Sequence, residues 1–157
     1  MRKLRVFESI SIDGYFTDTN GDMSWGHAGS DDPEFADWVS GTASAQMPMV
    51  AKGINAARKH LASRTIQPTW NNTQLLKGDL VKAVEDLKGS DGPDITVLGS
   101  GSVAAQLGEV GLVDEYQFVI IPVALGSGRT VFTKGRKLRL FHQRAFRCGN
   151  VVVTYAT

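Results

Sequence analysis

The stretch that most constrains the fold is residues 95–107, where a short apolar run passes through a turn with two glycines into a helical pattern. This order predicts a β-strand, a tight turn and a new helix. Backbone N–H groups point outward at a helix N-terminus and the helix dipole favours negative charge, so phosphate is the expected ligand. Gly99 and Gly101 would let the backbone approach it without a Cβ in the way. Glycines also occur at such turns for turn geometry alone, so both interpretations stay open.

Periodicity along the rest of the chain predicts one α/β domain over residues 1–157. Apolar runs, alternating or continuous, predict strands at residues 3–12, 59–63, 73–76, 95–98, 115–125, 138–146 and 151–155. Capping residues and amphipathic spacing predict helices over residues 32–39, 79–89 and 101–108, with a short helix within 47–55. Strands that alternate with helices imply crossovers and a partly parallel sheet, which would end in an antiparallel C-terminal hairpin around Gly149.

Composition excludes several classes of function. A net charge of +1, from 17 basic and 16 acidic residues, disfavours a nucleic-acid binder. The single cysteine, Cys148, excludes an intrachain disulfide, and the three histidines lack zinc-type spacing. No apolar run approaches the roughly 18 residues of a membrane span, and the N-terminus does not resemble a signal peptide. We therefore expect a cytoplasmic protein that acts on a small molecule, with no membrane, nucleic-acid or metal partner.

Two polar segments could carry chemistry. Asp13 stands at the end of the first predicted strand, where a carboxylate can hydrogen-bond or protonate a ligand, but Asp13-Gly14 is also a common turn sequence. Arg64 lies between Ser63 and Thr65, a cluster of donors suited to a phosphate monoester such as the 2′-phosphate of NADPH. A solvated surface arginine is the alternative.

Two further residues have equally open interpretations. Trp25 lies in a loop, where it either packs over the edge of the core or forms the wall of a substrate pocket. Glu115 opens the central strand, and a carboxylate there either points at a pocket or pairs at the surface. The chain has no Gly-x-Ser-x-Gly elbow and no Walker pattern, which argues against acyl transfer and P-loop chemistry.

The chain resembles the dihydrofolate-reductase-like family, because its motifs occur in the order found in that family. The family includes the C-terminal reductase domain of bacterial riboflavin-biosynthesis proteins. The resemblance covers most of the chain and is carried by residues 9–15, 63–65, 70–73, 97–102, 111–116 and 122–128. It implies a three-layer α/β sandwich with a mixed, mostly parallel sheet. It also implies an NADPH-dependent oxidoreductase that dimerises, and members of the riboflavin branch reduce a ribosyl group of a pyrimidine intermediate by hydride transfer.

The resemblance also implies roles for individual residues. The pyrophosphate of NADPH would be bound by Gly99, Ser100, Gly101 and Ser102, and its 2′-phosphate by Ser63, Arg64 and Thr65. The catalytic residues, where nicotinamide meets substrate, would be Asp13 and Glu115. Gly14, Tyr15 and Trp25 would line the substrate pocket.

One departure from the family concerns residues 40–46. They stand where the family usually has a strand followed by a Gly-Arg-x-Thr-Tyr-Glu-like turn and a helix. A missing strand in a central sheet would leave backbone groups unpaired or force a new pairing. Two main hypotheses follow: an NADPH-dependent reductase of a small heterocyclic or carbonyl substrate, and a catalytically degenerate homodimer that binds a ligand without turnover. A third is a site for a phosphate-bearing ligand other than a dinucleotide.

Overall fold

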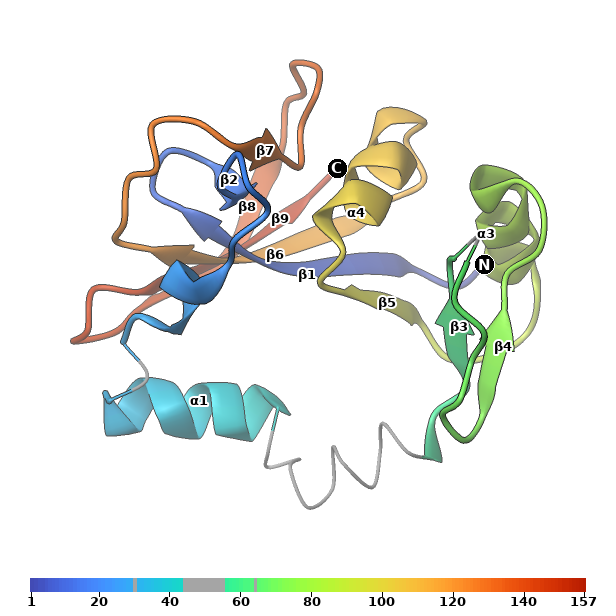
Figure 1. The fold of residues 1–157 in the computed structure, drawn as a ribbon, viewed down its shortest axis with the longest axis horizontal. Coiled ribbons are helices and arrows are strands. Elements are labelled where there is room, and N and C mark those ends of the chain that lie inside the picture. The colour runs from blue at the N-terminus through green and yellow to red at the C-terminus, as the bar shows by residue number, and fades with distance from the viewer. Residues whose placement is uncertain (30, 44–55, 64) are drawn as a thin grey trace.

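The protein is described here by a computed structural model of residues 1–29, 31–43, 56–63 and 65–157. Its main sheet has the strand order β5-β1-β6-β9-β8 (Figure 1). These strands are β1 (Leu4–Ser11), β5 (Ile95–Leu98), β6 (Glu115–Ile121), β8 (Arg139–Ala145) and β9 (Val151–Ala156). β5 and β6 run parallel to β1, whereas β9 is antiparallel to β6 and to β8. The mixed sheet and its C-terminal hairpin confirm the predicted fold class.

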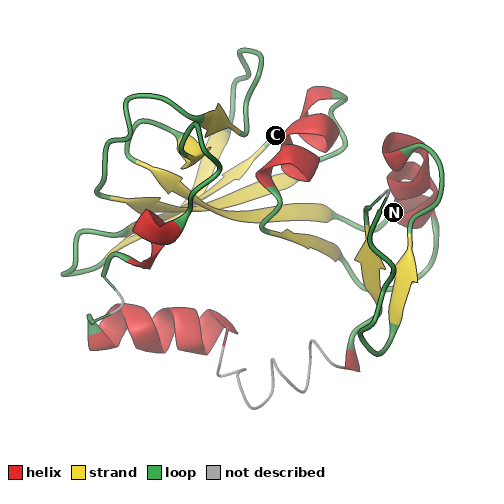
Figure 2. Cartoon of the chain, in the orientation of Figure 1, coloured by secondary structure: helices red, strands yellow, loops and turns green. Residues whose placement is uncertain are grey.

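Helices cover both faces of this sheet, which gives three layers (Figure 2). The helices are α1 (Pro33–Ala43), α3 (Leu80–Gly89) and α4 (Gly101–Glu109). On one face, Phe35 of α1 packs in an apolar cluster with Val119. On the other, Val84 of α3 and Leu107 of α4 share a larger cluster with Val6. The alternation of side chains along β1 and β6 directs apolar residues to both clusters.

Two helix starts follow the predicted capping pattern. The Asp79 side chain accepts a hydrogen bond from the N–H of Lys82 at 2.9 Å, and that of Asp32 accepts one from Glu34 at 2.9 Å. α1 runs on to Ala43, so the prediction that it ends after Val39 was too short. Once a helix is nucleated, each added residue gains a backbone hydrogen bond, which explains how it continues into a weakly patterned segment.

Two very short strands were not predicted. β2 (Tyr15–Thr17) pairs antiparallel with β7 (Arg129–Thr130), and a single 3₁₀ turn, η1 (Ser24–His27), follows β2. Strands of two or three residues are too short to show a period, and their pairing depends on a partner far away in the sequence. This small sheet folds the region after β1 back toward α4.

The strands β3 (Lys59–Leu61) and β4 (Thr73–Leu75) form a separate parallel pair. Figure 1 shows this pair standing apart from the main sheet, near the far end of β5. Among the strands that the structure describes, β5 pairs only with β1, and Leu98 is 63% exposed. The two outcomes expected where a family strand is missing, unpaired backbone groups or a new pairing, both stay predictions. Residues 44–46 and the predicted helix within 47–55 lie outside the described residues.

Candidate functional site

Three parallel strands bring three loops to one edge of the sheet. β5, β1 and β6 run in the same direction, so their carboxyl ends meet at this edge. The loops are residues 99–102 after β5, 12–15 after β1 and 122–126 after β6, which we call the carboxyl-end site. In open α/β sheets, ligands bind in the crevice outside the carboxyl ends of the strands. The topology therefore makes this edge the first candidate for a ligand site.

The start of α4 carries the features of an anion site. Gly99 has a φ of +62°, and a Cβ built on it would meet nothing within 4 Å. Ser100 has a φ of 60°, a left-handed conformation that costs free energy for a residue other than glycine. It makes no side-chain cap, and the N–H groups of Gly101 and Ser102 bond to no acceptor among the described residues. N–H groups without an internal acceptor at a helix N-terminus suit a phosphate oxygen, and of these two residues Ser102 is exposed whereas Gly101 is buried.

Gly101 has a different reason to be glycine. A Cβ at this position would fall 2.5 Å from the ring of Phe16, which is buried against it. A glycine is therefore needed for β2 to pack against α4, whatever binds outside. This packing is neither of the two roles that the sequence predicts for the turn glycines, whereas Gly99, with a φ of +62° and open space around it, is compatible with both.

Asp13 ties two of the three loops of the carboxyl-end site together, those after β1 and β6. Its carboxylate accepts a hydrogen bond from the Ser11 hydroxyl at 2.6 Å and another from the N–H of Gly126 at 2.7 Å. The Ser11 hydroxyl, followed by the backbone N–H groups, holds the pKa of Asp13 below its usual value. Gly14 then turns the chain with a φ of +89°. An ionised carboxylate with several donors serves as an acceptor in the site, not as a proton donor.

Glu115 lies at the opposite edge of the sheet from Asp13. The register pairs Arg5 with Glu115 and Ser11 with Ile121, so Glu115 is at the amino end of β6. Its carboxylate forms ion pairs with Lys3 at 2.7 Å and with Arg5 at 2.8 Å, and its pKa is lowered, first by the hydrogen bond from Lys3. The predicted catalytic pair of Asp13 and Glu115 is therefore wrong. Parallel strands start and end at opposite edges, and this separates the two residues.

The predicted pocket residues are also divided between two places. Tyr15 follows Gly14 directly and pairs with Thr130, so both Gly14 and Tyr15 belong to the carboxyl-end site. Trp25 packs against the cluster on the α1 face, and its indole N–H donates to the carbonyl of Asp22 at 3.1 Å. This agrees with packing at the core edge, and contact between Trp25 and a ligand stays a prediction.

The predicted 2′-phosphate donors are not brought to the start of α4. The Ser63 hydroxyl accepts the N–H groups of Thr65 at 3.2 Å and Ile66 at 2.9 Å, which closes a local turn. Upstream in β3, His60 has its pKa lowered by burial and then by the charge of Arg2, so β3 lies near the amino end of β1. In Figure 1 the segment after β3 and the start of α4 lie at opposite ends of β5. Arg64 is outside the described residues.

Sequence reasoning missed one buried carboxyl, that of Glu8. Glu8 is 2% exposed, and burial raises its pKa to about 7. One oxygen accepts the N–H of Ser9 at 3.1 Å, and the other has no partner among the described residues. The signal was present in the sequence, because Glu8 occupies an even position of the first strand, in line with Leu4 and Val6.

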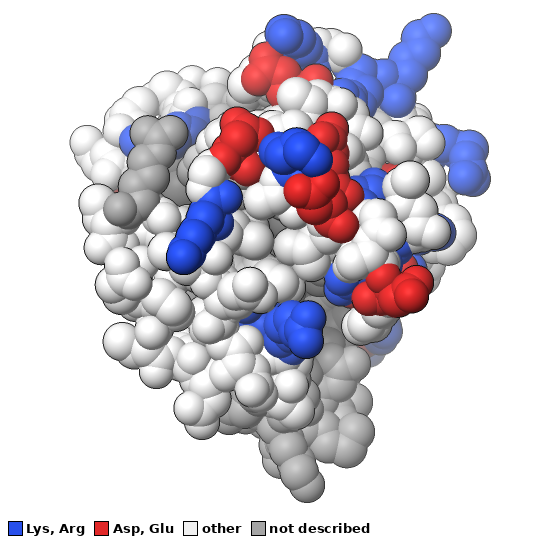
Figure 3. All heavy atoms as spheres, turned by 90° about the vertical axis from the view of Figure 1, so that its right-hand side faces the viewer, with Lys and Arg blue, Asp and Glu red and all other residues white. Residues whose placement is uncertain are grey.

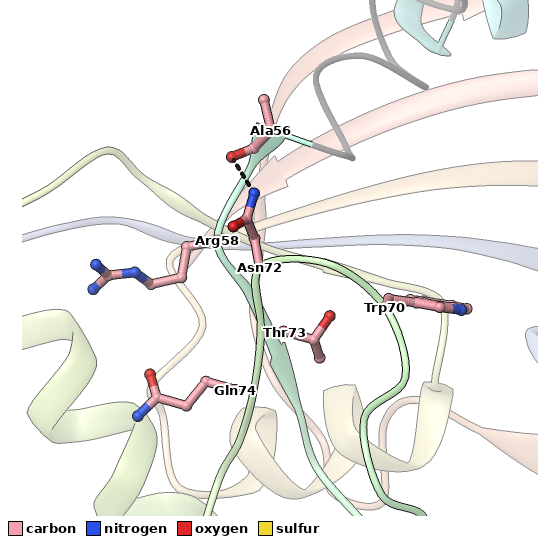
Figure 4. A pocket seen from close by; sticks show the side chains of 6 residues that line it. All are labelled: Ala56, Arg58, Trp70, Asn72, Thr73 and Gln74. Atoms are coloured by element: carbon pink, nitrogen blue, oxygen red, sulfur yellow. Dashed lines mark hydrogen bonds between the residues drawn. The ribbon is translucent and has the colours of Figure 1, made fainter.

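One hollow lies away from the carboxyl-end site. About 630 Å³ in volume, it is lined by Ala56, Arg58, Trp70, Asn72, Thr73 and Gln74. Figure 4 shows Arg58 and Gln74 pointing to one side of this segment and Trp70 and Thr73 to the other. These side chains do not converge on one point, as a ligand site requires.

Other kinds of site find little support in the described residues. They contain no group of three or more His, Cys, Asp or Glu side chains that could hold a metal ion. None of their helices combines the length and apolar character needed to cross a bilayer. Charges of both signs intermingle on the face that carries α3 and the β3–β4 pair (Figure 3). Such a face lacks the single-sign field of a nucleic-acid surface.

The residues present fit part of a dinucleotide. The start of α4 suits the pyrophosphate, whereas Ser63 and Thr65 do not reach the same edge. The strand order, the helix layers and the glycine turn into α4 define a dihydrofolate-reductase-like α/β protein. The chain belongs to the family of the RibD C-terminal domain, which matches residues 31–154.

Individual relatives agree with this family. The uncharacterized protein YyaP of Bacillus subtilis is 30% identical over 107 residues, which are 66% of this chain and 57% of that protein. The chain thus spans little more than half of this relative. A putative riboflavin biosynthesis protein from Shewanella sp. PV-4 superposes with a TM-score of 0.68 at 18% identity, over 98% of both chains. A Thermotoga maritima diaminohydroxyphosphoribosylaminopyrimidine deaminase/5-amino-6-(5-phosphoribosylamino)uracil reductase gives 0.64 at 12%, over 99% of this chain and 56% of that one.

Proposed function

We propose that this protein is an NADPH-dependent reductase that transfers hydride to a small heterocyclic substrate, pyrimidine- or pterin-like, or to a small carbonyl compound. The observation that carries the proposal is the uncapped N-terminus of α4 beside the open Gly99, at the carboxyl ends of three parallel strands. Membership of the RibD C-terminal domain family and the reductase named among the structural relatives support the same chemistry.

The chain's own contribution would be to hold the reactants. The N–H groups of Gly101 and Ser102 would bind the pyrophosphate, helped by the positive end of the α4 dipole. Asp13 would keep the 122–126 loop in place through the N–H of Gly126, and Tyr15 would line the substrate side. NADPH, when bound, supplies the hydride. Such a reaction depends on position more than on an unusual side chain.

A second candidate is a dimeric nucleotide-binding module without turnover. It is favoured by the distance between the start of α4 and the turn at Ser63, which leaves the dinucleotide with one clear anchor. The homodimer and the small-molecule ligand are shared by both candidates. Light scattering of the purified protein would test the dimer, and a monomer at micromolar concentration would exclude it.

Binding can be tested with a charge placed at the start of α4. Ser102 is exposed, and Ser102→Asp adds a negative charge where the phosphate should bind. The same substitution favours the helix itself, so loss of folding is not expected. The matched control is Gln106→Glu, one turn further along the exposed face of α4. We expect tryptophan fluorescence to report NADPH binding that weakens at least tenfold in Ser102→Asp and changes little in Gln106→Glu.

Three outcomes separate the hypotheses. If fluorescence does not change up to millimolar NADPH, the reductase proposal is wrong. If binding is the same in Ser102→Asp as in the parent protein, the phosphate site is not at α4. If NADPH binds but is not oxidised with any pyrimidine, pterin or carbonyl acceptor, followed by its nicotinamide absorbance, the module without turnover is the better description.

A further inference from the structure

The buried carboxyl of Glu8 lies beneath the start of α4. Side chains alternate along β1, so Glu8 points to the same face as Leu4 and Val6, which pack with Ala104 of α4. The register pairs Phe7 with Leu98, which puts Glu8 beside Gly99, the residue that opens the turn into α4. Neighbouring strands are about 5 Å apart, so the carboxyl is close to the first turn of that helix.

The surroundings of Glu8 keep it from water. Phe16, itself 5% exposed, is packed against Gly101 and belongs to the same cluster as Leu4 and Val6. On the neighbouring strand β6, the residue paired with Glu8 is Phe118, which is also buried. One carboxyl oxygen is left without a hydrogen-bond partner among the described residues. An ionised carboxylate in such a place is costly, and a second negative charge nearby would make it more so.

We propose that Glu8 takes up a proton from solvent when a phosphate group binds at the N-terminus of α4, so that anion binding at this site is coupled to the protonation of a buried carboxyl. The inference rests on the proposed function, because it needs a phosphate-bearing cofactor at that helix. It goes further in assigning a role to Glu8 and a pH dependence to cofactor affinity. The proton converts Glu8 from carboxylate to carboxylic acid.

No neighbouring charge offers a simpler explanation for the state of Glu8. Burial raises its pKa and the N–H of Ser9 opposes this, and no charged side chain is among the causes. β5 has no ionisable side chain. β1 itself carries Arg5. The other elements around Glu8 carry ionisable side chains at Glu115 and Tyr116 on β6, Tyr15 on β2, Arg129 on β7, Glu109 on α4, and Lys82, Glu85, Asp86 and Lys88 on α3. A bound phosphate would therefore add a strong charge near Glu8 where no charged side chain now shifts its pKa.

The test compares the parent protein with Glu8→Gln, a neutral side chain of the same shape. NADPH is titrated calorimetrically at pH 7.5 in two buffers of different ionisation enthalpy, which measures the protons taken up on binding. We expect uptake in the parent protein that is lost in Glu8→Gln, after subtraction of what the cofactor itself contributes. Between pH 6 and 8 the parent's affinity should fall about tenfold more than that of Glu8→Gln. Glu85→Gln, an exposed position on α3, is the matched control and should behave as the parent.

The outcomes distinguish this inference from the function on which it rests. Equal proton uptake and equal pH dependence in the parent and Glu8→Gln would overturn the coupling while leaving NADPH binding intact. Absence of NADPH binding in both proteins at pH 6 and at pH 8 would refute the proposed function, and the coupling with it. Proton uptake in the parent that Glu8→Gln abolishes, without loss of affinity at pH 8, would support both.

Discussion

Glu8→Gln should also change how the stability of the unliganded protein depends on pH. The pKa of Glu8 rises from an ordinary 4.5 to about 7 on folding, so the folded protein binds this proton more tightly than the unfolded chain does. Stability is therefore highest when Glu8 is protonated in both states, and it falls as pH rises from about 4.5 through 7. At about 1.4 kcal/mol per pKa unit, the full cost is about 3 kcal/mol above neutral pH.

Most of this cost develops within an accessible pH range. Between pH 5 and 8 the parent protein should lose about 2–3 kcal/mol relative to Glu8→Gln, because the glutamine cannot ionise. Urea unfolding at pH 5, 6, 7 and 8, with the slope of the transition compared at each pH, measures the difference directly. Glu85→Gln serves again as the control, and its free energy of unfolding should differ from that of the parent by a nearly constant amount over this pH range. A constant free-energy difference between parent and Glu8→Gln from pH 5 to 8 would refute the reasoning.

Three other substitutions test contacts of the fold and of the site. Lys88→Met removes hydrogen bonds of 2.6 Å to the carbonyl of Leu112 and the carboxylate of Asp114. The free energy of unfolding in urea should fall by about 2–4 kcal/mol. An unchanged urea midpoint would contradict this. Gly101→Ala should cost about 1–3 kcal/mol through overlap with Phe16, and a Phe16→Leu background should recover part of that loss if the ring is the cause. Asp13→Asn should make the free energy of unfolding less sensitive to acid. A carboxyl whose pKa is lowered on folding stabilises the fold above its unfolded pKa, and this stabilisation is lost as pH falls through the folded pKa. Identical acid sensitivity in parent and variant would exclude this role.

What the sequence predicts well depends on local signals. The caps at Asp32 and Asp79, the hairpin around Gly149 and the strand-turn-helix unit at Gly99 are each defined by residues within a few positions of one another. Such local signals can be recognised without knowing which strands pair with each other. The overall order of strands and helices then follows from the rules of crossover connections.

What the sequence does not predict depends on pairing over long distances. The residues alone leave Glu115 open between a pocket and a surface ion pair, and only the register places it beside Arg5, at the amino edge of the sheet. β2 and β7 are too short to be recognised without each other. Glu8 lies on the same face of β1 as its apolar neighbours, but its carboxyl is buried because β1 is an inner strand of the sheet.

The two halves of the expected dinucleotide site depend on different parts of the fold. The start of α4 is fixed by β5, β1 and β6, whose pairing in the main sheet is continuous. The Ser63 turn follows β3, which pairs only with β4 among the described strands, so nothing in that pairing fixes its distance from α4. The pyrophosphate binding proposed at α4 therefore does not depend on the predicted 2′-phosphate contacts at the Ser63 turn. For this reason the Ser102→Asp experiment and the turnover experiment answer separate questions, and a chain that binds NADPH without oxidising it is physically consistent with this arrangement of strands.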